Sequence, residues 1–178
     1  MTDPEQTQQT DRVEHRTERT FEVTATPEQV WDAIATADGI SAWMVPTQLD
    51  PRVGGEVSFD LGGFTSTGVI TDYTSNQRFA YEEPWPLPDR AEDIPAEMVT
   101  WFESIGVTLA DVFRDLPSIT PLATEFLVES ASGGTCVIRV VSSSYGTGAD
   151  WENEFFAEMA AGWNEMLNNL AAHFEKTS

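Results

Sequence analysis

A long amphipathic pattern occupies the end of this chain, from Trp151 to Phe174. Its large apolar residues recur at steps of three and four, which places them on one side of a single helix roughly 38 Å long. The stripe consists of Trp151, Phe155, Met159, Gly162, Trp163, Met166, Leu170 and Phe174. Because aromatic rings and flexible thioethers fill irregular space, such a stripe is typical of either an ordinary core helix or the floor of a cavity.

Charge and length restrict the classes of protein that the sequence can encode. Its 178 residues suffice for one domain with a core, and 30 acidic against 9 basic residues give a net charge of −21. Such a surface repels phosphate groups, so we expect neither a nucleic acid nor an anionic membrane as partner. Cys136 is the only cysteine, and no apolar run reaches the ~18 residues of a membrane span. The first residues lack the layout of a signal peptide, and we therefore expect a cytoplasmic protein.

Two parts of the chain differ in their capacity to form a core. Residues 1–12 are polar and are expected to form a disordered tail. Residues 13–178 are expected to form a single domain that begins with a strand over residues 13–24. Thr26 and Gln29 then predict the capping box of a first helix, with Pro27 at its first position. A second short helix is expected over residues 40–44.

Alternating runs bounded by turn residues predict the strands of one sheet. They cover residues 56–61, 64–73, 78–82, 122–130 and 135–144, and a glycine-rich turn joins the last two as a hairpin. With the first strand they predict a curved antiparallel sheet of six or seven strands around the long C-terminal helix. This is an α+β helix-grip fold with two short helices after its first strand.

One segment, residues 86–120, interrupts the succession of strands. It contains two helical patterns: Pro95 opens the first, Gly106 ends it, and Thr108 caps the second. Acidic residues outnumber its two arginines, Arg90 and Arg114. We expect an inserted helical hairpin that acts as a lid, as a docking surface for a protein partner, or as extra packing. The pattern favours packing combined with a lid.

Several short motifs resemble those of one known superfamily. They are Thr26 to Ile34, Ile40 to Met44, Asp50 to Phe59, Gly68 to Ile70, Arg78 to Glu82, Gly133 to Thr135 and Gly162 to Leu170. In order and spacing they resemble the SRPBCC or START-like superfamily, and within it the branch of activator of heat-shock protein 90 ATPase homologues (Aha-type). The resemblance covers residues 13–85 and 122–176, and it implies an apolar cavity between the sheet and the last helix. Members of the superfamily bind lipids, hormones or polyketides, and some are cyclases.

Residues with catalytic or metal-binding chemistry are few and dispersed. His15 and His173 lack metal-ligand spacing and are expected at the surface or at a rim. Cys136 lies within a strand pattern and is expected to be a small buried side chain. No serine lies in a nucleophile elbow. We therefore predict no metal, no cofactor and no catalytic residue, and an enzymatic function is unsupported.

Charged residues on the predicted strands leave one alternative open. Because strands alternate, most of these residues are expected to point outward into solvent, while an inward carboxyl would have a raised pKa and could act as an acid or base. The acidic candidates are Asp60, Asp72, Glu82, Glu125 and Glu129. Arg139 lies among apolar neighbours and could hold an anionic group of a ligand.

The leading hypothesis is a domain that binds a small, mainly apolar ligand between its sheet and its last helix. The predicted cavity lining consists of Trp43, Phe59, Tyr73, Phe79, Tyr81, Trp85, Phe126, Arg139, Phe155, Met159, Trp163 and Met166. A protein-interaction module is the first alternative, for example a chaperone regulator that uses the acidic insertion. A cyclase-like enzyme, with polar side chains that converge in the cavity, is the second.

Overall fold

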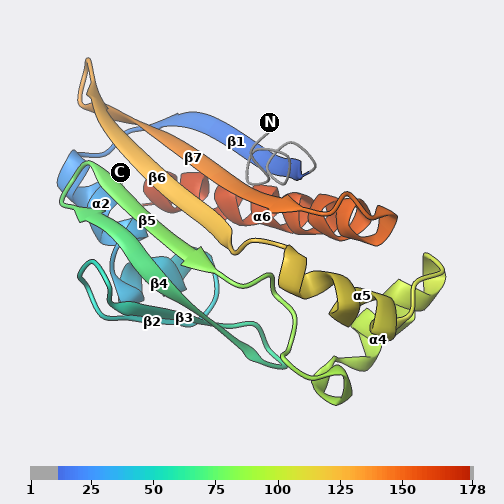
Figure 1. Cartoon of the computed structure of the whole chain (residues 1–178). Coiled ribbons are helices and arrows are strands. Elements are labelled where there is room, and N and C mark those ends of the chain that lie inside the picture. The colour runs from blue at the N-terminus through green and yellow to red at the C-terminus, as the bar shows by residue number, and fades with distance from the viewer. Residues whose placement is uncertain (1–11, 177–178) are drawn as a thin grey trace, which may run out of the picture.

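One curved antiparallel sheet and a long helix that lies along it dominate the computed structural model (Figure 1). The structure describes residues 12–176. The predicted α+β helix-grip fold is confirmed. The predicted disordered tail, residues 1–12, lies outside the described residues except for Arg12.

Within residues 12–176, seven strands form the sheet in the order β1-β7-β6-β5-β4-β3-β2, with every neighbouring pair antiparallel. Their bounds are β1 (Val13–Val23), β2 (Thr47–Leu49), β3 (Glu56–Asp60), β4 (Thr65–Thr74), β5 (Arg78–Glu83), β6 (Leu122–Ala131) and β7 (Thr135–Gly146). Six of them match predicted strands. The prediction misses β2, because three residues are too few to display an alternating pattern.

Two short helices, α2 (Pro27–Ile34) and α3 (Ala37–Trp43), follow β1. The predicted capping box is present at α2: the Thr26 hydroxyl accepts from the Gln29 backbone N–H, and the Gln29 side chain accepts from the Thr26 N–H. Trp31 on α2 and Trp43 on α3 are buried against the sheet. These helices therefore close one end of the sheet with packed aromatic side chains.

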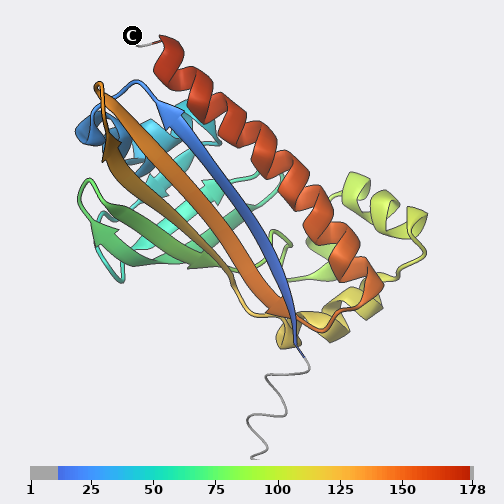
Figure 2. The ribbon, with the colours of Figure 1, turned by 90° about the horizontal axis from the view of Figure 1, so that it is seen from above.

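The last helix, α6 (Asp150–Lys176), is 27 residues long and runs along the sheet (Figure 2). Its two ends pack into different hydrophobic clusters. Trp151 near its start packs with Trp85 and Phe102, whereas Leu170 near its end belongs to the main core under α2 and α3. Trp163, between these ends, is only partly buried. The helix is thus anchored at both ends and less tightly covered in the middle.

The inserted segment packs against the start of α6. It contains α4 (Ala96–Ser104) and α5 (Leu109–Asp115), with short 3₁₀ turns η1 (Ala91–Asp93) and η2 (Leu116–Ser118) beside them. Gly106 between α4 and α5 has φ +76°, a left-handed conformation that glycine adopts readily. The Phe102 ring of α4 stacks on Phe155 of α6 with centroids 5.8 Å apart. The predicted helical hairpin is present, and its apolar side forms a second core with α6.

A buried pair of side chains connects β1 to the start of α6. His15 Nε2 lies 2.6 Å from Glu152 Oε1, and Glu152 also accepts hydrogen bonds from Thr147 and Gly148. Burial, the largest effect, acts to raise the pKa of Glu152, but these hydrogen bonds together outweigh it, so the pKa is lowered. The prediction of a surface or rim position for His15 is therefore wrong, since its side chain is buried.

Candidate functional site

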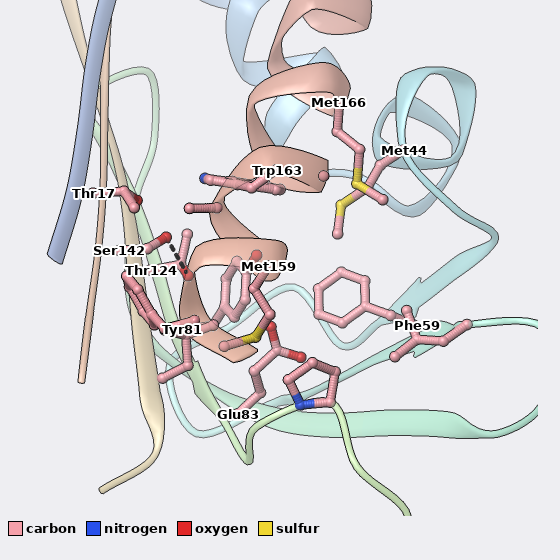
Figure 3. Close-up of a pocket in the computed structure, with 16 residues that line it drawn as sticks. Thr17, Met44, Phe59, Tyr81, Glu83, Thr124, Ser142, Met159, Trp163 and Met166 are labelled. Atoms are coloured by element: carbon pink, nitrogen blue, oxygen red, sulfur yellow. Dashed lines mark hydrogen bonds between the residues drawn. The ribbon is translucent and has the colours of Figure 1, made fainter. Parts of the chain in front are cut away.

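A pocket of about 250 Å³ lies between the middle of α6 and the sheet (Figure 3). Its lining comprises Thr17, Met44, Phe59, Leu61, Tyr81, Glu83, Pro86, Leu122, Thr124, Ser142, Phe156, Met159, Ala160, Gly162, Trp163 and Met166. An engineered apolar cavity of ~150 Å³ is known to hold benzene. The pocket therefore has room for a small organic molecule.

One wall of the pocket is apolar and comes largely from α6. Phe156, Met159, Trp163 and Met166 recur at steps of three and four, so successive turns of the helix present them to the same side. Phe59 of β3 lines the pocket across from this helix face (Figure 3). Thioethers adapt to irregular shapes and aromatic rings offer large apolar surfaces. This wall is suited to burying an apolar group.

The sheet side of the pocket carries a row of hydroxyl groups. Tyr81 of β5 lies opposite Thr124 of β6, which lies opposite Ser142 of β7, which lies opposite Thr17 of β1. Thr124 Oγ1 and Ser142 Oγ are 3.1 Å apart and share a hydrogen bond (Figure 3). Burial raises the pKa of the Tyr81 phenol well above its usual value, and the nearby Glu83 raises it further. The row thus offers neutral hydrogen-bonding groups to a ligand.

Glu83 adds an ionisable carboxyl to the pocket. It lies two residues after Tyr81 on β5, so both side chains point to the same face of the sheet. Its Oε2 accepts a hydrogen bond from Ser66 Oγ of β4 at 2.8 Å. Burial raises the pKa of Glu83 to about 7, and the hydrogen bond from Ser66 offsets only part of that effect. Its charge therefore changes near neutral pH.

Five of the twelve residues predicted to line the cavity do line this pocket. They are Phe59, Tyr81, Met159, Trp163 and Met166. They come from β3, β5 and α6, so the structure assembles them from three distant parts of the sequence. That they bind a ligand stays a prediction.

Four other predicted residues lie in the core between the sheet and the short helices, where Trp43, Phe79 and Phe126 border only a gap too small to hold water. Phe79 and Phe126 are fully buried and stacked, with ring centroids 6.3 Å apart. Trp43 donates its indole N–H to the Ala33 carbonyl, and Tyr73 donates its hydroxyl to the Ala35 carbonyl. Their placement in the pocket lining is corrected, because α2 and α3 fill the space in front of them.

Two further predicted residues, Trp85 and Phe155, belong to the second core instead. Their rings stack with centroids 5.9 Å apart, and the Trp85 indole donates a hydrogen bond to Ser144. Of the segment 86–120, Pro86 alone is among the lining residues of the pocket. The packing therefore does not support the predicted lid role of this segment, because its helices cover the start of α6 and not the pocket.

Arg139 points away from the pocket and forms an exposed ion pair with Glu18, with Arg139 Nε 2.6 Å from the carboxylate. On β7 the even-numbered positions, such as Ile138, Val140 and Ser142, are the buried ones, so Arg139 falls on the other face. The suggestion that it holds an anionic ligand group is therefore corrected.

The acidic strand residues also point outward, as expected. Arg78 pairs with Asp72 and Glu125, while Asp60, Glu82 and Glu129 are exposed. The sequence interpretation missed Glu83, which faces inward. The alternation itself could have identified it, because Tyr81 was placed inward and Glu83 is two residues later. Thr124, Ser142 and Thr17 were missed because single hydroxyl residues on strands carry no signal until the cross-strand register is known.

Groups that could bind a metal or act as a catalytic set are sparse. Across residues 12–176, no cluster of three or more His, Cys, Asp or Glu side chains is arranged to hold a metal ion. Cys136 is buried, as predicted, and burial raises the pKa of its thiol. In the same range no helix has the length and apolarity to cross a membrane.

Comparison with known protein families assigns this chain to one family. The family described as Activator of Hsp90 ATPase homolog 1-like protein matches residues 24–175. The chain belongs to this family. The match covers strands β2 to β7, the insertion and nearly all of α6, so the Aha-type branch predicted from the motifs is confirmed. A comparison with curated proteins finds no match.

Solved structures share the fold at low sequence identity. The Aha1 dimer from Colwellia psychrerythraea has a TM-score of 0.61 and 16% identity, with 90% of this chain and 96% of that one covered. Protein MLL2253 from Mesorhizobium loti has a TM-score of 0.63 and 12% identity, with 92% and 99% covered. CalU16 from Micromonospora echinospora has a TM-score of 0.55 and 14% identity, with 89% and 82% covered. These similarities establish the fold of this Activator of Hsp90 ATPase homolog 1-like chain.

Proposed function

We propose that this chain binds a small, mainly apolar molecule in the pocket between α6 and the sheet. The observation that carries the proposal is a hollow of about 250 Å³ whose lining combines aromatic rings and thioethers with a few hydroxyls. Small-molecule sites are typically concave and mostly apolar, with a small number of polar groups that fix orientation. The binding free energy would come mainly from apolar burial, at roughly 25 cal/mol per Å² before the costs of immobilisation.

Packing at both ends of α6 supports this function. Because Trp151 and Leu170 are buried in separate clusters, the helix keeps its position over the pocket without a ligand to hold it there. A preformed site has less ordering cost to overcome on binding.

Two neighbouring alanines of α6 give a matched test. Ala160 lines the pocket, whereas Ala161 is exposed and is not among the lining residues. Titration calorimetry with a panel of small apolar compounds should show saturable binding to the wild type and to Ala161→Phe. Ala160→Phe should fill the pocket and weaken binding at least tenfold. Saturable binding that is equal in both variants, or none to any compound in the wild type, would exclude the proposal.

A protein partner is the second candidate, and the charge of the insertion favours it. Asp89, Glu97 and Glu103 are exposed, and for none of them does the described structure contain an ion pair within 4.0 Å. Since the family is named for activation of the Hsp90 ATPase, an Hsp90 protein from the same source is the partner to test. This role would be supported if the chain raises the ATPase rate of that Hsp90 protein and if the double variant Glu97→Gln/Glu103→Gln raises it less. A rate that the chain does not change would remove it.

A further inference from the structure

The ionisable groups of the pocket have an unusual balance of charge. Glu83 contributes a carboxyl, and the lining contains no Lys, Arg or His. The nearest inward residues of β1 on either side of Thr17 do not line the pocket: His15 is hydrogen-bonded to Glu152, and the Arg19 guanidinium donates to the Asn164 carbonyl. A ligand carboxylate would therefore meet another carboxylate and no cation.

Several features favour a cation in the same place. Glu83 accepts one hydrogen bond, from Ser66 to its Oε2 atom. Among residues 12–176, no donor bonds to its Oε1 atom. Phe59, Tyr81 and Trp163 line the pocket, and the faces of aromatic rings attract ammonium groups. The net charge of −21 also raises the local concentration of cations and lowers that of anions.

We propose that the ligand is an apolar molecule that carries a protonated amine, with Glu83 as its counter-ion. This inference rests on the proposed function and narrows it to one chemical class. The apolar part would lie against Met159, Trp163 and Met166, and the amine would lie at the Glu83 end of the pocket, where its N–H groups donate to the carboxylate. The hydroxyl row from Tyr81 to Thr17 would then accept or donate hydrogen bonds along the remaining polar edge.

A trio of compounds of nearly equal size tests this inference. 3-Phenylpropylamine, 3-phenylpropan-1-ol and 3-phenylpropanoate differ mainly in the terminal group. Since hydrogen bonds to charged groups are worth more than neutral ones, the amine should bind about tenfold more tightly than the alcohol at pH 8. The carboxylate should bind more weakly than the alcohol. Titration calorimetry measures all three affinities.

Two neighbouring glutamates supply the matched variants. Glu83→Gln should reduce amine affinity about tenfold and alcohol affinity much less, so that the preference for the amine over the alcohol is lost. Glu82→Gln removes the same charge from the exposed face of β5 and should leave both affinities unchanged. If Glu82→Gln weakens amine binding as much as Glu83→Gln does, the amine is responding to the overall charge and the inference is wrong.

The dependence on pH gives a second readout. Between pH 6 and pH 8 the amine stays protonated while Glu83 ionises, so amine affinity should rise in the wild type and stay level in Glu83→Gln. His15 is the other group to consider, because its ring contacts Phe156 of the pocket lining. If amine affinity still depends on pH in Glu83→Gln, Glu83 is not the group responsible and the inference is contradicted.

The outcomes separate the two proposals. If the alcohol binds and the amine binds no better, the inference about the ligand class is overturned while the proposed function stands. If none of the three compounds binds to the wild type, the inference about the ligand class is overturned, and the proposed function is decided by the wider panel of apolar compounds.

Discussion

Two glutamates near α6 show how position alone sets the behaviour of a carboxyl. Glu152 accepts hydrogen bonds from His15, Thr147 and Gly148, and its pKa is lowered despite burial. Glu83 accepts one, from Ser66, and burial raises its pKa to about 7. The number of donors around each carboxylate decides which effect prevails. Glu152 is thus a structural anion, whereas Glu83 is a carboxyl with few donors that lines the pocket.

The raised pKa of Glu83 makes stability depend on pH. In the unfolded chain the carboxyl ionises near its usual pKa of 4.5, and in the folded protein near about 7, so ionisation of the unfolded state removes stability as pH rises from 4.5 to 7. Glu83→Gln should therefore stabilise the protein at pH 8 by on the order of 2 kcal/mol, after allowance for partial solvent access, and have no such effect at pH 4. Chemical denaturation at both pH values measures this.

The exposed neighbour Glu82 provides the comparison for that measurement. Glu82→Gln should change stability by less than about 0.5 kcal/mol at either pH. A gain from Glu83→Gln that is the same at pH 4 and pH 8 would show that the carboxyl does not ionise within the folded protein as described.

At the scale of elements, α6 combines three environments along one helix. Its start packs on the insertion, its end on the main core, and its middle borders the pocket. Gly162 lies in the middle portion, is exposed, and a Cβ built on it would meet no atom within 4 Å. No neighbouring atom therefore requires a glycine at this position, and glycine in the interior of a helix lowers the stability of that helix.

Gly162→Ala should stabilise the protein by about 0.5–1 kcal/mol, because alanine restricts the unfolded chain and favours helix. The melting temperature should rise by roughly 1–4 °C for a protein of this size. Gly146→Ala is the opposing control, since a Cβ there would lie 1.9 Å from Glu152 Oε1. Calorimetric melting curves in which Gly162→Ala is destabilised would contradict the open space beside that residue.

The elements were more predictable from the sequence than the pocket. The capping box at Thr26, the strand periodicity and the 3.6-residue stripe of α6 are local patterns, and each produced the expected element. The pocket depends on which side chains fill the space in front of each strand. Phe79 and Phe126 look like cavity residues by alternation, but α2 and α3 cover them. Glu83 and Thr124 become a site only through the register of β5 and β6.

For the whole molecule, charge repulsion opposes compactness. The net charge is −21, and the exposed arginines pair with only some of the acidic side chains. Each exposed ion pair contributes little to the free energy of unfolding, so weakening these pairs with salt costs little stability. Salt also screens the repulsion between the unpaired acidic side chains, and this gain is expected to be larger. The structure as a whole should therefore be more stable at higher ionic strength.

Raising NaCl from about 0.02 M to 0.5 M, which shortens the screening length several-fold, should increase the melting temperature by several degrees. NaCl is preferable to sulfate, because sulfate also strengthens apolar burial by exclusion from the surface. A melting temperature that falls with NaCl would mean that the ion pairs outweigh the repulsion.

The separate anchoring of the two ends of α6 has a consequence for how relatives of this chain diverge. Met159, Trp163 and Met166 border the pocket and pack only partly against the two clusters, whereas Trp151 and Leu170 are buried within those clusters. Under the proposed function, ligand recognition would rest mainly on the middle of α6, and the position of the helix mainly on its two ends. On that proposal, relatives that differ at the pocket positions of α6 would differ in the molecule they bind and keep the same architecture.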